Sequence, residues 1–176
     1  SKSNIEFFNN NIININKILW KIKRIKIYTE KDSKKEILKF ENKSDQIFSI
    51  VQNYKLKKLL MKKIKKSKFI KFRNDFKNLD TGKSEYKLVI NCDPTHNLSK
   101  KFFSKKIEKN YNSYAYTTTI IHKRIKNNTA FQNFTKNGPL AFLPISESET
   151  SIVYSFKSIN KNHSFEINNL IKKYNP

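Results

Sequence analysis

Residues 129–145 constrain the fold more than any other part of the sequence. The segment reads TAFQNFTKNGPLAFLPI and holds one of the two glycines and two of the four prolines of this 176-residue chain. Its two apolar runs flank a short polar stretch that ends at Gly138, and glycine provides the backbone freedom that a tight reversal requires. The segment therefore predicts two short strands joined by a turn.

The sequence on either side of this segment extends the same pattern. Residues 111–124 are rich in Tyr, Thr and Ile, as is typical of a long strand. We expect four consecutive strands, at residues 111–124, 129–135, 140–145 and 151–156, and consecutive strands form an antiparallel sheet. The apolar spacing of residues 164–174 predicts a helix after the sheet.

The first half of the chain mixes helical and strand patterns. Apolar residues three and four apart predict helices at residues 3–20 and 54–64, and a short helix is expected at residues 97–106. Alternating apolar residues predict a hairpin of residues 22–28 and 36–40, a short strand at residues 48–52, and paired strands at residues 69–72 and 75–79 that lead into a turn at residues 80–83. Residues 86–90 form a nearly continuous apolar run, which is typical of a strand buried on both faces.

The charge of the chain suggests a nucleic-acid partner, but the choice of basic residues argues against it. The formal net charge is +23, yet only Arg24, Arg73 and Arg124 are arginines among 37 basic residues. Arginine grips phosphate and guanine with two parallel hydrogen bonds, so a dedicated nucleic-acid binder uses it heavily. An abundance of Lys, Asn and Ile is typical of adenine- and thymine-rich codons, and we expect no nucleic acid as the main partner.

The number and spacing of cysteines and histidines and the length of the apolar runs argue against a disulfide-stabilised, a zinc-binding and a membrane-spanning protein. The only cysteine is Cys92, which allows no internal disulfide, and no Cys or His pair has zinc-ligand spacing, so we expect no metal site. No apolar run reaches the roughly 18 residues that span a bilayer. We expect a cytoplasmic protein, and the basic surface is compatible with peripheral association with the inner membrane.

Three segments carry a family resemblance. Residues 88–97, LVINCDPTHN, are similar to the Leu-Val-Gly-Ala-Asp-Gly-Thr-His-Ser segment of flavin-dependent aromatic hydroxylases of the p-hydroxybenzoate hydroxylase type. Residues 138–144, GPLAFLP, with AFQNF before them and SIVY after them, resemble the ubiquinone-biosynthesis branch of that family. Residues 50–60 are similar to the family's Val-Val-Glu-Asn helix entry. The likeness covers, with gaps, residues 20 to 156, the central portion of such an enzyme.

The resemblance implies an α+β fold with α/β-like character. An antiparallel substrate-domain sheet would lie beside part of a Rossmann-like FAD-binding layer, with the FAD-binding region at residues 1–110, the sheet at residues 111–160 and a C-terminal helix at residues 161–176. In the family, FAD reduced by NAD(P)H activates oxygen, and one oxygen atom is transferred to an electron-rich ring. The substrate would be a prenylated aromatic precursor of ubiquinone.

The same resemblance assigns candidate site residues. Asp93 and Asn53 would contact the cofactor, and Asp93 has an alternative as a turn or helix-capping residue, as Asn53 has as the cap of a helix beginning at Tyr54. The substrate would lie against Pro139, Leu140, Phe142 and Pro144, for which a plain core strand is the alternative. No acid–base catalytic residue is expected, and His96 is expected to be a surface residue.

The sequence departs from the family in ways that limit the function of this chain. No Gly-x-Gly-x-x-Gly occurs, because Gly82 and Gly138 are the only glycines. Pro94 stands where the family has Gly, and proline has no N–H to offer a phosphate. The absent initiator Met and an unfinished tail favour a central fragment that is inactive alone. A lysine-rich module that binds nucleic acid or anionic lipid, and a degenerate, non-catalytic family member, are the alternatives.

Overall fold

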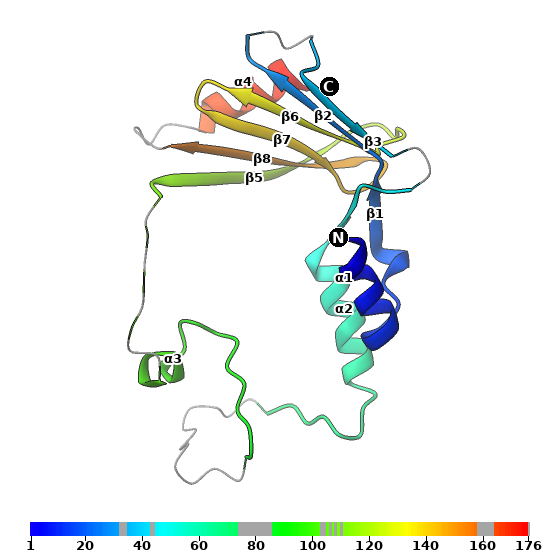
Figure 1. Cartoon of the computed structure of the whole chain (residues 1–176), viewed down its shortest axis with the longest axis vertical. Helices are drawn as coiled ribbons and strands as arrows, with labels where there is room; N and C mark the ends of the chain where they lie inside the picture. Colours follow the sequence, from blue (N-terminus) through cyan, green and yellow to red (C-terminus); the bar gives the residue numbers. More distant parts are fainter. Residues whose placement is uncertain are drawn as a thin grey trace. The chain divides into compact units, whose positions relative to one another are not determined.

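The computed structural model describes residues 1–31, 35–42, 45–73, 86–102, 105, 107, 109, 111–157 and 164–175. The protein has an α+β fold and divides into two units: Ser1–Lys66 with Asn112–Pro176, and Ser67–Tyr111. The first unit contains the two sheets (Figure 1).

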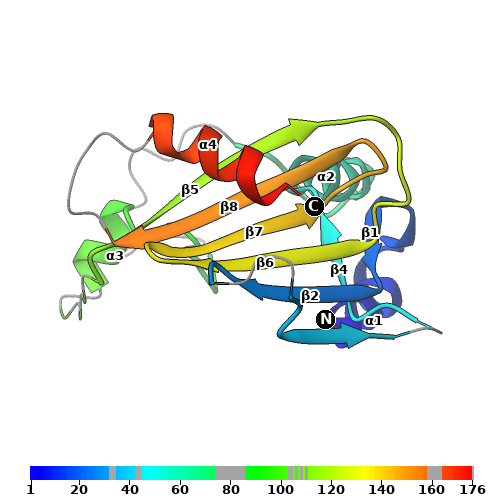
Figure 2. The ribbon, with the colours of Figure 1, turned by 90° about the horizontal axis from the view of Figure 1, so that it is seen from above.

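The larger sheet of the first unit has six strands in the order β3-β2-β6-β7-β8-β5. Neighbouring strands are antiparallel, except that β2 and β6 are parallel. Figure 2 shows the strands side by side from above. Their bounds are β2 Arg24–Thr29, β3 Leu38–Glu41, β5 Ser113–Ile121, β6 Thr129–Thr135, β7 Gly138–Pro144 and β8 Glu149–Lys157.

The antiparallel sheet and its closing helix were predictable from local pattern. The predicted strands at residues 111–124, 129–135, 140–145 and 151–156 are confirmed as β5 to β8, and the helix at residues 164–174 is confirmed as α4, Ser164–Tyr174. The hairpin of β2 and β3 is also confirmed. These two strands precede residue 110 in the sequence and still join the sheet of β5 to β8, through the pairing of β2 with β6.

A second, two-stranded sheet pairs β1, Leu19–Ile22, with β4, Phe48–Val51. The expected helix at residues 54–64 is confirmed as α2, Asn53–Ile64. The helix expected at residues 3–20 is shorter: α1 spans Lys2–Phe7, a π-helical turn η1 spans Phe8–Ile12, and a 3-10 turn η2 spans Asn16–Ile18. Helical structure cannot continue to residue 20 as expected, because Leu19 and Trp20 pair with β4 in the two-stranded sheet.

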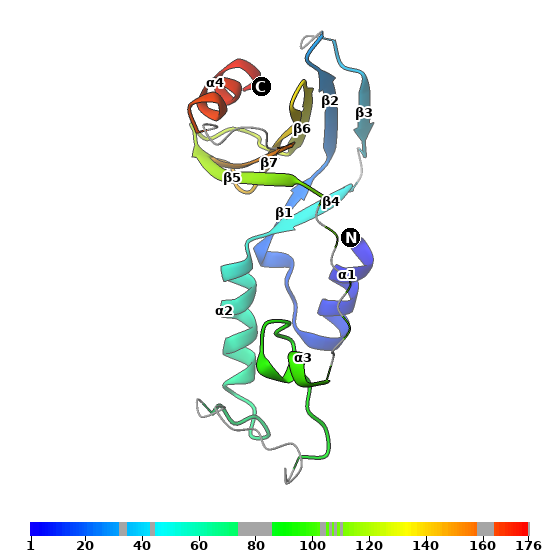
Figure 3. The same cartoon turned by 90° about the vertical axis from the view of Figure 1, so that its left-hand side faces the viewer.

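The core lies between the six-stranded sheet and α4 (Figure 3). Cross-strand partners share a face of a sheet, and successive residues alternate between faces. Leu140 and Phe142 of β7 therefore face α4 together with Ile152 and Tyr154 of β8. Ile167 and Tyr174 of α4 complete this buried cluster.

Two strand predictions in the second unit are wrong. Residues 86–90 were expected in a strand buried on both faces, but they form no strand, and the side chains of Leu88 and Ile90 are 75% and 76% exposed. Residues 69–72 form no strand either. A strand requires a neighbour to pair with, and the described part of the second unit contains none. The strand at residues 75–79 and the turn at residues 80–83 lie outside the described residues.

The predicted helix at residues 97–106 is confirmed in its first part as α3, Asn97–Phe102. It belongs to the second unit.

Candidate functional site

The four predicted substrate residues of β7 lie in different environments. Leu140 and Phe142 are 0% and 1% exposed and belong to the core under α4. Pro144 is also buried on this face, whereas Pro139 points to the opposite face. The strand therefore offers no single surface formed by all four side chains.

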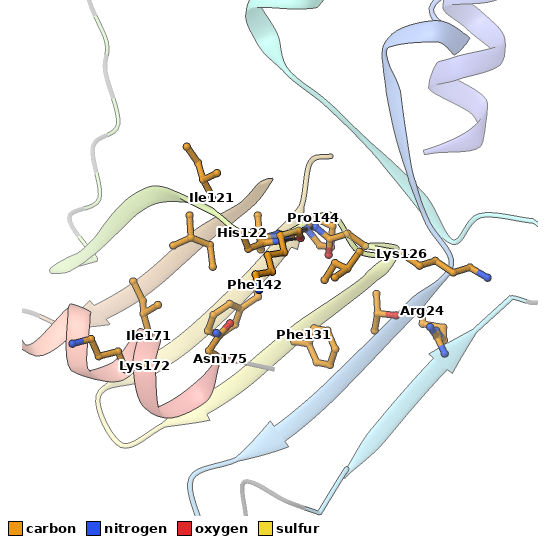
Figure 4. Close-up of a pocket in the computed structure, with 16 residues that line it drawn as sticks. Arg24, Ile121, His122, Lys126, Phe131, Phe142, Pro144, Ile171, Lys172 and Asn175 are labelled. Atoms are coloured by element: carbon orange, nitrogen blue, oxygen red, sulfur yellow. Dashed lines mark hydrogen bonds between the residues drawn. The ribbon is translucent and has the colours of Figure 1, made fainter. Parts of the chain in front are cut away.

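A cavity of about 610 Å³ opens between the sheet and the end of α4. Figure 4 shows Phe131 and Phe142 beside it, with Arg24 toward β2 and Ile171 on α4. Phe142 and Pro144 line this cavity, whereas Pro139 and Leu140 do not. Its volume falls in the range of small-molecule sites, which is about 300–1,000 Å³.

One wall of the cavity is a hydrogen-bonded group of polar side chains. The His122 Nδ1 lies 2.8 Å from the Lys123 carbonyl oxygen, and its Nε2 lies 3.0 Å from Thr150 Oγ1. A carbonyl oxygen can only accept, so Nδ1 carries the proton, and in the neutral imidazole Nε2 accepts from the Thr150 hydroxyl. Asn127 Nδ2 donates to Thr150 Oγ1 at 3.0 Å and to the Ser146 carbonyl oxygen at 2.9 Å.

This polar wall is hydrogen-bonded within itself and largely buried. Asn127 and Thr150 are both buried; Asn127 lies in the loop before β6, and Thr150 lies within β8. No sequence pattern points to these residues or to Arg24 at the far side of the cavity. His122, Asn127 and Thr150 form no sequence motif, because Thr150 follows Asn127 by 23 positions, and their assembly depends on the folded sheet.

Asp93 lies in a tight turn of the second unit. Its Oδ1 accepts hydrogen bonds from the Thr95 hydroxyl at 2.7 Å and from the Thr95 backbone N–H at 2.8 Å. The Thr95 hydroxyl, followed by the Thr95 backbone N–H, lowers the pKa of the exposed Asp93 carboxyl group. These contacts correspond to the alternative that the sequence leaves open, a turn residue.

The neighbours of Asp93 form a second hollow of about 650 Å³, lined by Asn91, Cys92, Pro94, Thr95, Ser99, Lys100 and Lys105. His96, which was expected at the surface, is half-buried, and its Nδ1 accepts a hydrogen bond from the Leu98 N–H at 3.2 Å. This contact satisfies a backbone donor at the start of α3.

Asn53 is the first residue of α2 and is exposed. The alternative that it caps this helix is wrong, because the capping position is Gln52, which makes no side-chain capping hydrogen bond. Asn53 belongs to the first unit and Asp93 to the second.

Gly138 and Pro94 do not form an FAD phosphate site. Such a site needs backbone N–H groups that a phosphate can approach closely, usually at glycine. A Cβ added to Gly138 would collide with the Ser155 carbonyl oxygen, so the space beside this glycine is filled by β8. Gly82 lies outside the described residues, and Pro94 has no N–H.

Among the described residues, no group of three or more His, Cys, Asp or Glu side chains is placed to hold a metal ion. No helix of these residues is both long and apolar enough to cross a bilayer.

Comparison with protein-family models finds no matching family, and a search of curated proteins finds no match.

Proposed function

We propose that this chain forms the substrate-facing part of an FAD-dependent monooxygenase that hydroxylates an aromatic ubiquinone precursor with NAD(P)H and oxygen. The observation that carries the proposal is the face of the six-stranded sheet opposite α4. Alternation along the paired strands places small, apolar and hydroxyl side chains on this face. Much of it is accessible in the described part of the first unit, with Thr117, Thr119 and Phe134 exposed.

The centre of this open face suits a planar apolar ligand. Ala141 and Leu143 of β7 lie beside Val153 and Ser151 of β8, and all four are only half-buried. Short side chains on neighbouring strands make a flat surface, and aromatic rings bury large apolar areas against such surfaces. Pro139, one of the predicted substrate residues, lies on this face.

The buried residues of β7 fit a different role in the same proposal. Leu140 and Phe142 pack against α4 from the other side of β7, and they hold this strand in place. In this arrangement Pro139 contacts substrate, whereas Leu140, Phe142 and Pro144 act through the position of β7.

The cofactor half of the proposal rests on the second unit. The exposed side chains of Leu88 and Ile90 precede the Asp93 turn, and a Rossmann-like FAD-binding layer would bury such an apolar run. In this proposal the glycine-rich phosphate loop is supplied by polypeptide outside these 176 residues. The 176-residue chain alone is therefore expected to bind no flavin.

The proposal is tested on the complete product of the gene. We expect it to purify with a flavin absorbance spectrum and to consume NAD(P)H faster when a prenylated phenol is added. With isotopically labelled dioxygen, the labelled oxygen should appear in the ring product. A folded, colourless full-length protein that gains no flavin on incubation with FAD would overturn the proposal and favour a degenerate, non-catalytic protein.

A matched pair of variants tests the role of Asp93 in the complete protein. Asp93→Asn removes the carboxylate charge but keeps an acceptor oxygen in the turn, and we expect FAD affinity to fall by about tenfold. Asp45→Asn is the control, because Asp45 lies in the first unit and its carboxylate is 3.8 Å from the exposed Lys2 ammonium group. Equal FAD affinity in both variants would leave Asp93 as a turn residue only.

One surface favours peripheral membrane association as an additional property. Lys57, Lys58 and Lys62 of α2 are exposed, and in the described part of the chain no acidic side chain pairs with them. Each lysine near an anionic bilayer contributes about 1 kcal/mol. Sedimentation with vesicles that contain anionic lipid should be salt-sensitive and should weaken in a triple Lys→Gln variant of these positions. Equal binding of the variant would exclude this surface.

A further inference from the structure

We propose that the cavity between α4 and the sheet is a binding site for an amphiphilic carboxylate, with its acyl chain against Phe131 and Phe142 and its carboxylate at Arg24. The site lies on the α4 side of the sheet, whereas the proposed substrate face lies on the other side. The inference therefore does not depend on the flavin proposal.

The floor of the cavity is apolar and comes from elements distant in sequence. Phe131 of β6 and Phe142 of β7 are cross-strand partners, and Ile171 of α4 lies opposite them (Figure 4). Ile120 and Ile125 add further aliphatic surface. Removing a hydrocarbon chain from water into such a lining gains about 0.8 kcal/mol for each buried methylene group.

The polar lining carries charge of only one sign. Arg24, Lys123, Lys126 and Lys172 line the cavity, and none of the Asp or Glu residues that the structure describes does. Figure 4 shows Lys126 and Lys172 extending outward at the rim, where they attract an anion to the opening. A cationic amphiphile would meet four like charges and no partner.

Arg24 is the group best placed to hold a carboxylate. Within the described part of the chain, its Nη2 reaches Asn128 Oδ1 alone, at 3.5 Å, which is the limit of a hydrogen bond. Its cross-strand neighbour Glu41 is held in an ion pair with Lys39 at 2.6 Å. A guanidinium group has five N–H donors in a planar fork that matches the two oxygens of a carboxylate.

The polar wall of the cavity is internally hydrogen-bonded. In the network of His122, Thr150 and Asn127, each side chain is held by hydrogen bonds within the wall. These groups do not need a ligand to satisfy them, so the main attractions for a ligand are the apolar floor and Arg24. A long-chain alcohol would gain the first attraction but not the second.

The single tryptophan provides a local readout for a titration of the 176-residue chain. The Trp20 indole N–H donates to the carbonyl oxygen of Asn127, which lines the cavity. We expect decanoate to change the Trp20 fluorescence with saturable, one-to-one stoichiometry, confirmed by titration calorimetry. Decanol should bind about tenfold more weakly, and decyltrimethylammonium should not bind.

Paired arginine variants separate a specific site from general attraction to a basic protein. Arg24→Gln should weaken decanoate binding about five- to tenfold, Arg24→Lys should weaken it less, and the affinity for decanol should not change. Arg124→Gln is the control, because Arg124 does not line the cavity and forms an ion pair with Glu147. Circular dichroism melts confirm that each variant is folded, and Lys172→Gln at the rim replaces Arg24→Gln if the latter does not fold.

Three outcomes would overturn the inference. They are equal affinity for decanoate and decanol, equal weakening by Arg24→Gln and Arg124→Gln, and the absence of saturable binding below the concentration at which decanoate forms micelles.

Discussion

The indole N–H of Trp20 donates a 2.6 Å hydrogen bond to the carbonyl oxygen of Asn127, 107 positions further along the chain. The bond joins the small sheet of β1 and β4 to the loop that precedes β6. Asn127 also anchors the polar wall of the cavity through its side chain. One residue therefore connects the two sheets of the first unit and the candidate ligand site.

This relationship predicts a stability loss on substitution of Trp20. Trp20→Phe removes the only indole donor and leaves the Asn127 carbonyl oxygen without it, and a buried acceptor without a partner costs about 1–3 kcal/mol. Urea unfolding followed by circular dichroism should show a lower free energy of unfolding by that amount. Tyr54→Phe is the control, because its hydroxyl group bonds to Gln52 at the exposed surface, and there a change below about 0.5 kcal/mol is expected.

Gly138 has a backbone conformation that residues with a side chain rarely adopt. Its φ is +146°, and a Cβ there would strike the Ser155 carbonyl oxygen of the neighbouring strand. We expect Gly138→Ala to lower the free energy of unfolding by about 3 kcal/mol or more, since strain and steric overlap act together. Lys136→Ala in the adjacent turn is exposed and should change it by less than about 0.5 kcal/mol. A Gly138→Ala protein as stable as the parent would contradict this geometry.

Leu140 distinguishes a structural role from direct contact with substrate. Leu140→Ala deletes a side chain with no exposed surface and should cost about 2–5 kcal/mol. Leu38→Ala makes the same chemical deletion at a half-exposed position of β3 and should cost much less. Thermal and urea unfolding measure both changes. In the complete protein, Leu140→Ala should lower the free energy of unfolding clearly but change the Michaelis constant for the aromatic substrate only slightly.

The turn at Asp93 predicts a specific dependence on pH. Its lowered pKa means that the folded turn favours the ionised carboxylate, so the turn is fully stabilised above the unfolded pKa and loses this stabilisation as the pH falls through the lower folded value. Thr95→Val removes the hydroxyl donor, which is the largest cause, and keeps the backbone donor. NMR titration of the Asp93 carboxyl carbon should show a higher pKa in Thr95→Val, and an unchanged value would contradict the assigned cause.

Local sequence pattern predicted the elements whose stabilising partners are close in sequence. The strands β6 and β7 are joined by a two-residue turn, and α4 shows its apolar spacing directly. The parallel pairing of β2 with β6 was not predictable, because no local pattern specifies a strand partner 105 residues away, as Arg24 and Thr129 are. The same limit explains residues 86–90, whose apolar run matches a buried strand but has no strand to pair with in the described part of its unit.

The candidate site was predictable only in part, for a related reason. Phe142 and Pro144 stand out in an unusual run of the sequence, and both line the cavity. Arg24, His122 and Asn127 are single polar residues in a lysine- and asparagine-rich chain, and only the folded sheet brings them to one place. Their roles depend on register and not on sequence spacing.

The parallel contact between β2 and β6 also sets the order in which the protein can assemble on the ribosome. β2 is synthesised before β6, the strand that it pairs with in the folded protein, and β6 is complete only when residue 135 has been synthesised. Until then the apolar residues of the β2–β3 hairpin stay accessible, and pairings between distant segments form slowly. During translation the hairpin waits for β6, and slower synthesis across residues 67–111 would prolong its exposure.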